Sequence, residues 1–130
     1  MNFDFEEERN LSPSETLIMK AVWDAGEDIA VPELIEVLRE RYGKDYARTT
    51  VVTFLLHLSD KGFVRTYRKG KLSYVHVLKS EEEYKTKLLK ENTDFWFHGS
   101  AARLVSALCS SKKLTKDEIE EIKDLLDGLD

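Results

Sequence analysis

The stretch from Tyr46 to His76 constrains the fold most, because its hydrophobic period changes at one glycine. Before Gly62, apolar residues recur at the three- and four-residue spacing of a buried helix face, namely Val51, Phe54, Leu55 and Leu58. After Gly62, two β-rich runs flank a basic turn, Arg68-Lys69-Gly70-Lys71, whose glycine can adopt the positive φ of a tight hairpin. The pattern predicts a helix over about residues 48–61 followed by a β-hairpin.

Two further helices are predicted before this stretch. The run Ser12-Pro13-Ser14-Glu15 is a typical helix start, with a capping side chain, a proline in the first turn and a capping-box glutamate. A second helix begins at Pro32 and ends at Gly43, and Ile29-Ala30-Val31 before it is a candidate minimal strand that pairs with the hairpin. Three helices and a two-stranded hairpin, joined by short turns, predict a mainly α protein with a winged helix-turn-helix domain over residues 11–79.

Residues 80–130 are predicted to form amphipathic helices with more apolar surface than a small domain can cover. Capping boxes at Ser80–Glu83 and Thr115–Glu118 mark two helix starts. A segment of this size rarely forms a stable core alone, so we expect a dimerisation domain in which the tails of two chains interlock. The alternative is a tail folded back onto its own domain in a monomer. The residues expected in the dimer interface are Tyr84, Leu88, Phe95, Trp96, Phe97, Leu104, Val105, Leu108, Ile119, Ile122 and Leu126. Residues 1–10, without any period, are expected to form a loose arm.

The formal net charge of −5 conceals a basic segment. Residues 1–38 carry ten acids and two bases, giving −8, and residues 72–130 carry twelve acids and nine bases, giving −3. Residues 39–71 carry nine Lys or Arg and three acids, giving +6, and the three charges return −5. Salt screens charges over about 8 Å at physiological ionic strength, so local charge governs binding to phosphate. This segment predicts a surface for a polyanion, and the alternative from charge alone is a lysine-rich solvated face.

The polar side of the predicted third helix and the basic turn suit double-stranded DNA. Threonine offers a hydroxyl to base edges and a methyl to the 5-methyl group of thymine, and an arginine near the helix start can reach guanine or a phosphate. The candidate base-reading residues are Arg48, Thr49, Thr50 and Thr53, and the candidate phosphate contacts on the hairpin are Arg65, Arg68, Lys69 and Lys71. The alternative for the threonines is that they bond only to local backbone groups.

The sequence does not predict an enzyme. His57, His76 and His98 lack the spacing of metal ligands, and the chain has no glycine-rich phosphate loop and no paired-cysteine motif. No catalytic residue, metal site or cofactor is therefore expected. Cys109 is the one cysteine, expected to pack as a small hydrophobe, and its inability to form an internal disulfide fits the cytoplasm. No apolar run approaches the ~20 residues of a membrane span, so no membrane contact is expected.

Three motifs, LSPSETLIMKAVW, TTVVTFLLHLSDKGFV and RKGKLSYV, carry a resemblance to a known family. The chain resembles the penicillinase and methicillin-resistance repressors (BlaI/MecI type) from Leu11 to about Asp127, and the pattern T-V-x-T-x-L-x-x-L-x-x-K-G from Thr50 to Gly62 is fairly specific. The resemblance implies a dimeric winged-helix repressor that reads a palindromic operator with this helix and dimerises through C-terminal helices. It also implies that Thr49, Thr50 and Thr53 occupy base-contacting positions.

Three departures from the family pattern limit what the resemblance implies. His57 stands where many members have arginine, so the contact with the DNA backbone expected there is weaker or pH-sensitive. Members controlled by a membrane sensor protease are cut at an Asn-Phe peptide, and the matching pair here is Ala107-Leu108, so the sequence does not support a sensor protease as partner. Copper-responsive relatives end in paired Cys-x-Cys motifs, whereas this chain has only Cys109.

The sequence therefore predicts a cytoplasmic, homodimeric transcriptional repressor. Its recognition helix, about residues 48–61, and its basic wing would bind a pseudo-palindromic DNA operator. The alternative from another class is a winged-helix interaction module that binds protein through its aromatic tail and does not bind DNA.

Overall fold

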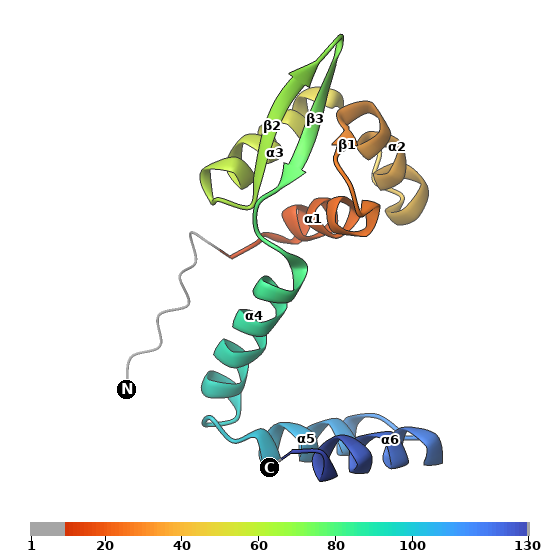
Figure 1. Cartoon of the computed structure of the whole chain (residues 1–130), viewed down its shortest axis with the longest axis vertical. Coiled ribbons are helices and arrows are strands. Elements are labelled where there is room, and N and C mark those ends of the chain that lie inside the picture. The colour runs from red at the N-terminus through yellow and green to blue at the C-terminus, as the bar shows by residue number, and fades with distance from the viewer. Residues whose placement is uncertain (1–9, 130) are drawn as a thin grey trace. The chain divides into compact units, whose positions relative to one another are not determined.

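The computed structural model describes residues 10–129 (Figure 1). The chain divides after Leu88 into two compact units, and each is described by itself. The elements are α1 (Pro13–Ala25), β1 (Ile29–Ala30), α2 (Val31–Tyr42), α3 (Arg48–Asp60), β2 (Val64–Lys69), β3 (Leu72–Val77), α4 (Glu81–Trp96), α5 (Ala101–Ser111) and α6 (Lys116–Asp127). The predicted loose arm lies outside the described residues except for Asn10.

Helix α1 begins where the sequence predicted, because Ser12 caps it. The hydroxyl of Ser12 accepts a hydrogen bond from the Glu15 backbone N–H (3.2 Å), and the Glu15 carboxylate accepts one from the Ser12 N–H (2.8 Å). This reciprocal pair completes the predicted capping box. The helix ends at Gly26, whose φ of 71° lies in the left-handed region that glycine adopts without a steric penalty. Helix α3 starts at the predicted residue, Arg48, and ends at Asp60, one residue earlier than predicted.

The three strands form one antiparallel sheet in the order β1-β3-β2. Strand β1 has two residues and pairs with β3, with Ile29 opposite Val75, which confirms the predicted minimal strand. Strands β2 and β3 form the predicted hairpin, in which Lys69 lies opposite Leu72 across the turn. Gly70 in this turn has a φ of 64°. The first unit is thus a winged helix with a mainly helical core.

A hydrophobic cluster joins α1, α2, α3 and the sheet. Its fully buried side chains include Ile18, Met19, Leu34, Leu38, Val51, Leu58, Phe63, Val64 and Val75. Burying a side chain of this size stabilises a fold by about 1.5–3 kcal/mol, so the cluster is the main source of stability in this unit. It also decides which side of α3 remains open to solvent.

The first two turns of α4 pack against this winged-helix unit. The Tyr84 ring lies 5.5 Å from the Phe63 ring and 5.9 Å from the Trp23 ring, measured between centroids. The Tyr84 hydroxyl also accepts a hydrogen bond from the Leu11 backbone N–H (3.3 Å). Tyr84, one of the residues expected in the dimer interface, thus also packs within its own chain. The compact unit extends to Leu88, whereas the predicted domain boundary is at residue 79.

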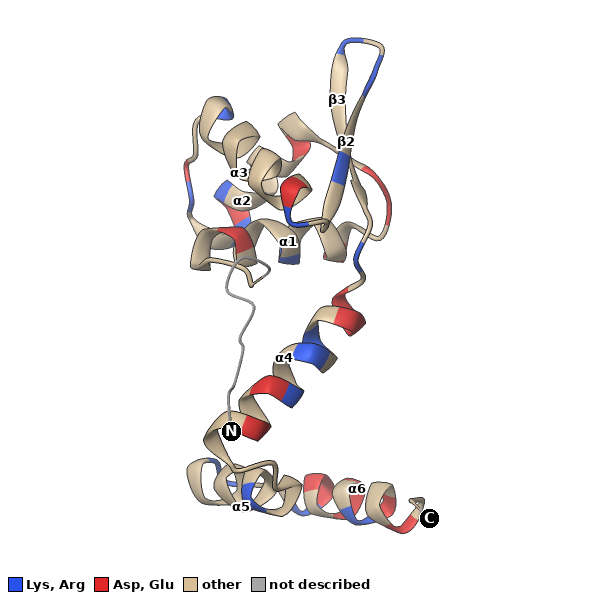
Figure 2. Cartoon of the chain, turned by 90° about the vertical axis from the view of Figure 1, so that its left-hand side faces the viewer, with Lys and Arg blue, Asp and Glu red and all other residues tan. Residues whose placement is uncertain are grey.

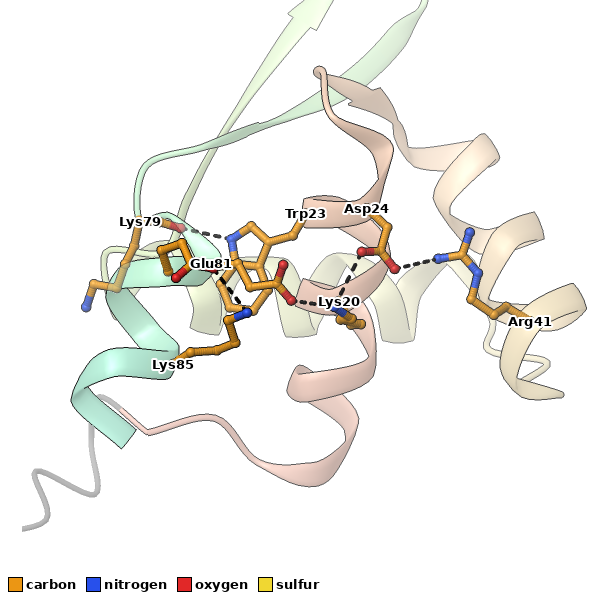
Figure 3. A network of polar contacts seen from close by, with 8 residues as sticks. Lys20, Trp23, Asp24, Arg41, Lys79, Glu81 and Lys85 are labelled. Carbon is orange, nitrogen blue, oxygen red and sulfur yellow. Dashed lines mark hydrogen bonds and ion pairs between the residues drawn. The ribbon is translucent and has the colours of Figure 1, made fainter. Parts of the chain in front are cut away.

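A polar network surrounds the same junction (Figure 3). The indole N–H of Trp23 donates a hydrogen bond to the carbonyl oxygen of Lys79 (2.9 Å). The neighbouring ion pairs join Lys20 with Glu81, Lys20 with Asp24, and Asp24 with Arg41. Exposed ion pairs each contribute little, so the aromatic contacts and the Trp23 hydrogen bond account for most of the attachment of α4.

The second unit holds the end of α4 together with α5 and α6. Helix α4 continues to Trp96, and the chain then turns at His98 and Gly99, which have φ values of 52° and 75°. Helix α6 begins at the predicted capping box between Thr115 and Glu118. Within the described range, none of the residues of α4, α5 or α6 is buried. The apolar side chains of these helices therefore all remain at least partly accessible.

Candidate nucleic-acid interface

Helix α3 presents most of its predicted DNA-contacting residues to solvent. Arg48, Thr49, Thr53 and His57 are exposed, whereas Thr50 is partly buried. The opposite side of the helix packs in the hydrophobic cluster, which fixes the rotation of α3 about its own axis. The structure therefore brings the predicted residues together on one open surface, with Thr50 at its edge.

The hydroxyl of Thr53 is already engaged within the helix. It donates a hydrogen bond to the carbonyl oxygen of Thr49 (2.9 Å). This is the kind of bond predicted by the alternative in which the threonines bond only to local backbone groups. A hydroxyl has one donor and two acceptor sites, so Thr53 can still accept a hydrogen bond. Its methyl group remains available for an apolar contact. The hydrogen bond to Thr49 therefore occupies the Thr53 donor, but it leaves an acceptor site and the methyl group for contact with a base edge.

Two aliphatic side chains share the open surface of α3. Val52 is 38% exposed and Leu56 is 59% exposed, and they are one helical turn apart. Neither residue was predicted to have a role, because each is next in sequence to a buried apolar residue, Val51 or Leu55. The sequence signal that could have identified them is the helical period, which places positions 52 and 56 outside the sector of Val51, Leu55 and Leu58.

The start of α3 is held by an aromatic contact. The Tyr46 ring meets the Phe54 ring edge-on at 5.8 Å, and the Tyr46 hydroxyl donates a hydrogen bond to the Ser14 hydroxyl (3.0 Å). Ala47, at the N-cap position, provides no side-chain cap. The first turn of α3 also contains no acidic residue, so it adds no negative charge beside Arg48.

The end of α3 is joined to α1 by a shielded ion pair. The Lys61 ammonium donates hydrogen bonds to the Glu15 carboxylate (2.6 Å) and to the Asn10 carbonyl oxygen (2.9 Å). The Glu15 side chain is only 3% exposed and the Lys61 side chain 21%. Burial raises the pKa of Glu15, but the bonds from Lys61 and Ser12 outweigh it and lower that pKa overall. The capping-box spacing revealed Glu15, but no sequence signal paired it with a residue 46 positions away.

The basic wing divides its charges between two faces of the sheet. Figure 2 shows basic residues at the hairpin tip, where Arg68, Lys69 and Lys71 are exposed. Alternate residues of a strand point to opposite faces. Arg68 therefore shares a face with the core-packed Val64, while Arg65 lies on the other face with its guanidinium 5.3 Å from the centre of the Tyr67 ring. Lys69, at the end of β2, lies on the same face as Arg65, so of the three predicted cations in β2 only Arg68 lies on the face that packs in the core.

Asp28, in the loop before β1, contacts both strands of the wing on their outer face, which is the face that carries Arg65 and Tyr67. Its carboxylate accepts a hydrogen bond from the Tyr67 hydroxyl on β2 (2.6 Å), and its other oxygen lies 2.8 Å from Nδ1 of His76 on β3. The bond from Tyr67 and then the contact with His76 lower the pKa of Asp28. No role for Asp28 was predicted from the sequence, because its partners are 39 and 48 positions away.

The predicted dimer-interface residues all remain at least partly accessible. The exposed members are Leu88, Phe95, Trp96, Val105, Leu108, Ile119 and Leu126, and the partly buried members are Tyr84, Phe97, Leu104 and Ile122. Cys109 is exposed on α5, so it does not have the packed position expected for it within its own chain. The pair Ala107-Leu108 also lies within α5.

Over residues 10–129, no group of three or more His, Cys, Asp or Glu side chains could hold a metal ion. The same range contains no helix long and apolar enough to cross a membrane.

Comparisons with known proteins agree with this arrangement. The model of the penicillinase repressor family matches residues 11–128. The methicillin resistance regulatory proteins MecI of Staphylococcus aureus strain N315, Staphylococcus epidermidis and Mammaliicoccus sciuri are each 26% identical over 116 residues, which cover 89% of this chain and 92% of each relative. The solution structure of the DNA binding domain of the repressor BlaI matches with a TM-score of 0.50 and 25% identity, covering 58% of this chain and 89% of that domain.

Proposed function

We propose a function for this chain on the basis that it belongs to the penicillinase repressor family. Its first unit has the winged-helix fold of the DNA binding domain of the repressor BlaI. We infer that the protein is a homodimeric transcriptional repressor that binds a pseudo-palindromic operator. In this role α3 enters the major groove and the hairpin contacts the flanking backbone. Action on chromosomal DNA would place the protein in the cytoplasm.

The observation that carries the proposal is the joint position of a threonine-bearing helix face and a cationic hairpin on one packed core. Thr49 and Thr53 are exposed on α3, and the exposed cations of the turn lie on a sheet that shares the hydrophobic cluster with α3. Residues 39–71 carry a charge of +6 in a chain whose net charge is −5. Phosphate attraction depends on this local charge and not on the total.

The residues are proposed to act in two groups. Arg48, Thr49, Thr50 and Thr53 lie near the start of α3, the part of a recognition helix that contacts base edges. Arg68, Lys69, Lys71 and His57 contact phosphates, which position the protein on DNA without reading sequence. Arg65 is the weakest member of this second group, because its guanidinium already packs over the Tyr67 ring.

The homodimer is supported by the exposed apolar surface of the second unit. Trp96 is 66% exposed, Leu108 51% and Leu126 58%, and large apolar side chains exposed in one part of a chain are typical of an interaction site. A symmetric dimer presents two copies of α3, and half-sites on one face of DNA are about 34–36 Å apart or a multiple of that distance. A pseudo-palindromic operator matches this symmetry.

The salt dependence of binding to duplex DNA tests the proposal. We expect the affinity, measured by fluorescence anisotropy from about 50 to 200 mM salt, to fall steeply because phosphate contacts release counterions. Palindromes that contain A·T pairs should bind more tightly than random duplexes. An affinity that does not change over this range would exclude the DNA-binding function. It would favour an interaction module that binds protein through its aromatic tail.

A further inference from the structure

The open surface of α3 contains an aliphatic strip, defined by Val52 and Leu56. Their exposed fractions are 38% and 59%, whereas Leu55 between them is 3% exposed and belongs to the core. The strip therefore lies outside the hydrophobic cluster that holds α3 in place. It is next to the exposed Thr49 and Thr53 on the same helix.

The strip borders a hollow between α3 and the wing. This hollow has a volume of about 290 Å³ and is lined by Val31, Val52, Leu55, Leu56, Thr66, Tyr67, Arg68 and Ser73. Its helix side is aliphatic, and Arg68 supplies a positive charge on its wing side. An occupant that suits both sides carries an apolar group close to a negative one.

Double-stranded DNA has these two groups in the required proximity. The 5-methyl group of thymine is the apolar group on the base edges of the major groove, where the other groups are hydrogen-bond donors and acceptors. The sugar–phosphate backbone that borders the groove supplies the negative charge. An aliphatic side chain on a helix in the major groove therefore gains most by covering a thymine methyl.

We propose that Val52 and Leu56 determine part of the sequence specificity by contacting thymine methyl groups in each operator half-site, while Arg68 pairs with the adjacent phosphate. This inference rests on the proposed DNA-binding function. It adds two residues to the base-reading group and assigns them a base. The threonines read hydrogen-bonding groups beside the strip.

Replacing thymine by deoxyuridine tests this inference, because the substitution removes only the 5-methyl group. The probe is the duplex that the wild-type protein enriches from a random-sequence library, substituted at one thymine at a time. We expect one or two positions in each half-site at which the wild-type affinity falls about fourfold per methyl. With the unsubstituted probe, Val52→Ala should bind about fivefold and Leu56→Ala about tenfold more weakly.

The decisive measurement is the coupling between protein and DNA changes. The penalty is the loss of affinity when deoxyuridine replaces one thymine. At the thymine that Val52 contacts, this penalty should disappear in Val52→Ala and persist in Leu56→Ala, and the reverse should hold at the thymine that Leu56 contacts. Leu78→Ala is the control, because Leu78 is an exposed leucine (54%) outside α3 and should leave every penalty unchanged. Thermal melting verifies that each variant is folded.

The outcomes separate this inference from the function on which it rests. If the wild-type protein binds no duplex, the proposed function fails. If it binds with the expected salt dependence but no deoxyuridine substitution weakens it, the strip does not read thymine and the inference is overturned. Penalties that persist unchanged in both alanine variants also overturn it, because other residues would then contact the methyl groups.

Discussion

At the scale of single residues, Thr53 illustrates how a helix can limit the chemistry of a base-reading side chain. Its hydroxyl hydrogen bonds to the Thr49 carbonyl oxygen, so toward a base it is best suited to accept a hydrogen bond. The amino groups of adenine and cytosine are the donors in the major groove. Thr53 is therefore expected to prefer bases that present an amino group, or the methyl of thymine.

The division between base-reading and phosphate-binding residues can be tested by substitution. Lys69→Ala and Lys71→Ala should weaken binding to all duplexes about equally and reduce the salt slope by about 1 each. Thr50→Ala and Thr53→Ala should instead reduce discrimination between operator and random DNA, by on the order of 1–3 kcal/mol per lost contact. Anisotropy titrations with both DNA types measure the two effects. If all four variants behave alike, the proposed division is wrong.

Glu15 offers a stability test at the same scale. Glu15→Gln keeps an acceptor for the Ser12 N–H but removes the charge that pairs with Lys61. Loss of a hydrogen bond to a charged group costs about 1.5–3 kcal/mol, and we expect a loss in this range in urea unfolding at pH 7. Glu118→Gln is the matched control, since Glu118 occupies the same capping-box position on α6. Its ion pair with Lys112 is exposed (64% and 38%), so its loss should cost less than about 1 kcal/mol.

The effect of Glu15 should depend on pH in one direction. Its pKa in the folded protein is below the ordinary value of 4.5, so the ionised form contributes stability above pH 4.5. This contribution is lost as the pH falls through the folded-state pKa. The difference in unfolding free energy between wild type and Glu15→Gln should therefore be constant near neutrality and shrink below pH 4.5. A difference that grows on acidification would contradict the assigned pKa shift.

At the scale of secondary-structure elements, the wing is a two-stranded hairpin that needs support beyond its own turn. The short strand β1 pairs with β3 on one edge. Tyr67 stacks on Tyr74 at 5.7 Å, and the Asp28 carboxylate joins β2 and β3 from the outer face. These contacts restrict the orientation of the hairpin and therefore where its cations can meet phosphates.

Asp28→Asn tests this support. The amide replaces the carboxylate that accepts from Tyr67 and pairs with His76, so the hairpin should become more mobile. We expect faster amide hydrogen exchange in β2 and β3, and up to fivefold weaker binding to all duplexes, about the upper range for one exposed polar pair. Glu27→Gln is the control, because it removes one negative charge from the neighbouring residue and so measures the effect of lost charge alone on DNA affinity. Equal behaviour of the two variants would show that the Asp28 contacts do not position the wing.

At the scale of the whole molecule, the two units differ in how much apolar surface they bury. The winged-helix unit has fully buried side chains from all three of its helices and from the sheet. In the second unit, none of the described residues of α5 and α6 is buried, and most of their large apolar side chains are exposed. Such a segment gains a core by pairing with a second copy, which is the proposed role of α5 and α6.

Sedimentation at micromolar concentration tests the pairing. The wild-type chain should sediment as a dimer, and Leu108→Asp or Leu126→Asp should shift it to a monomer, because a charge at the paired surface is costly to bury. The monomer should bind the operator about two orders of magnitude more weakly, since one monomer binds a single half-site whereas a dimer binds both half-sites together. Leu78→Asp, which changes an exposed leucine of the first unit, should remain dimeric. A monomeric wild-type protein would exclude the proposed dimer.

The elements of this protein were predictable from its sequence because their signals are local. The Ser12–Glu15 capping box, the change of period at Gly62 and the Arg68–Lys71 turn each lie within a few residues, and α1, α3 and the hairpin appear where these signals place them. The two-residue β1 was predicted from the short apolar run Ile29-Ala30-Val31, and it pairs with the hairpin as expected.

The tertiary structure alone decided which distant residues meet. Asp28 reaches Tyr67 across 39 positions, Glu15 reaches Lys61 across 46, and Leu11 reaches Tyr84 across 73. Periodicity reports which side of an element is apolar, but it does not report the angle at which elements pack. That angle attaches the start of α4 to the winged helix and places Arg68 beside Val52 and Leu56 around one hollow.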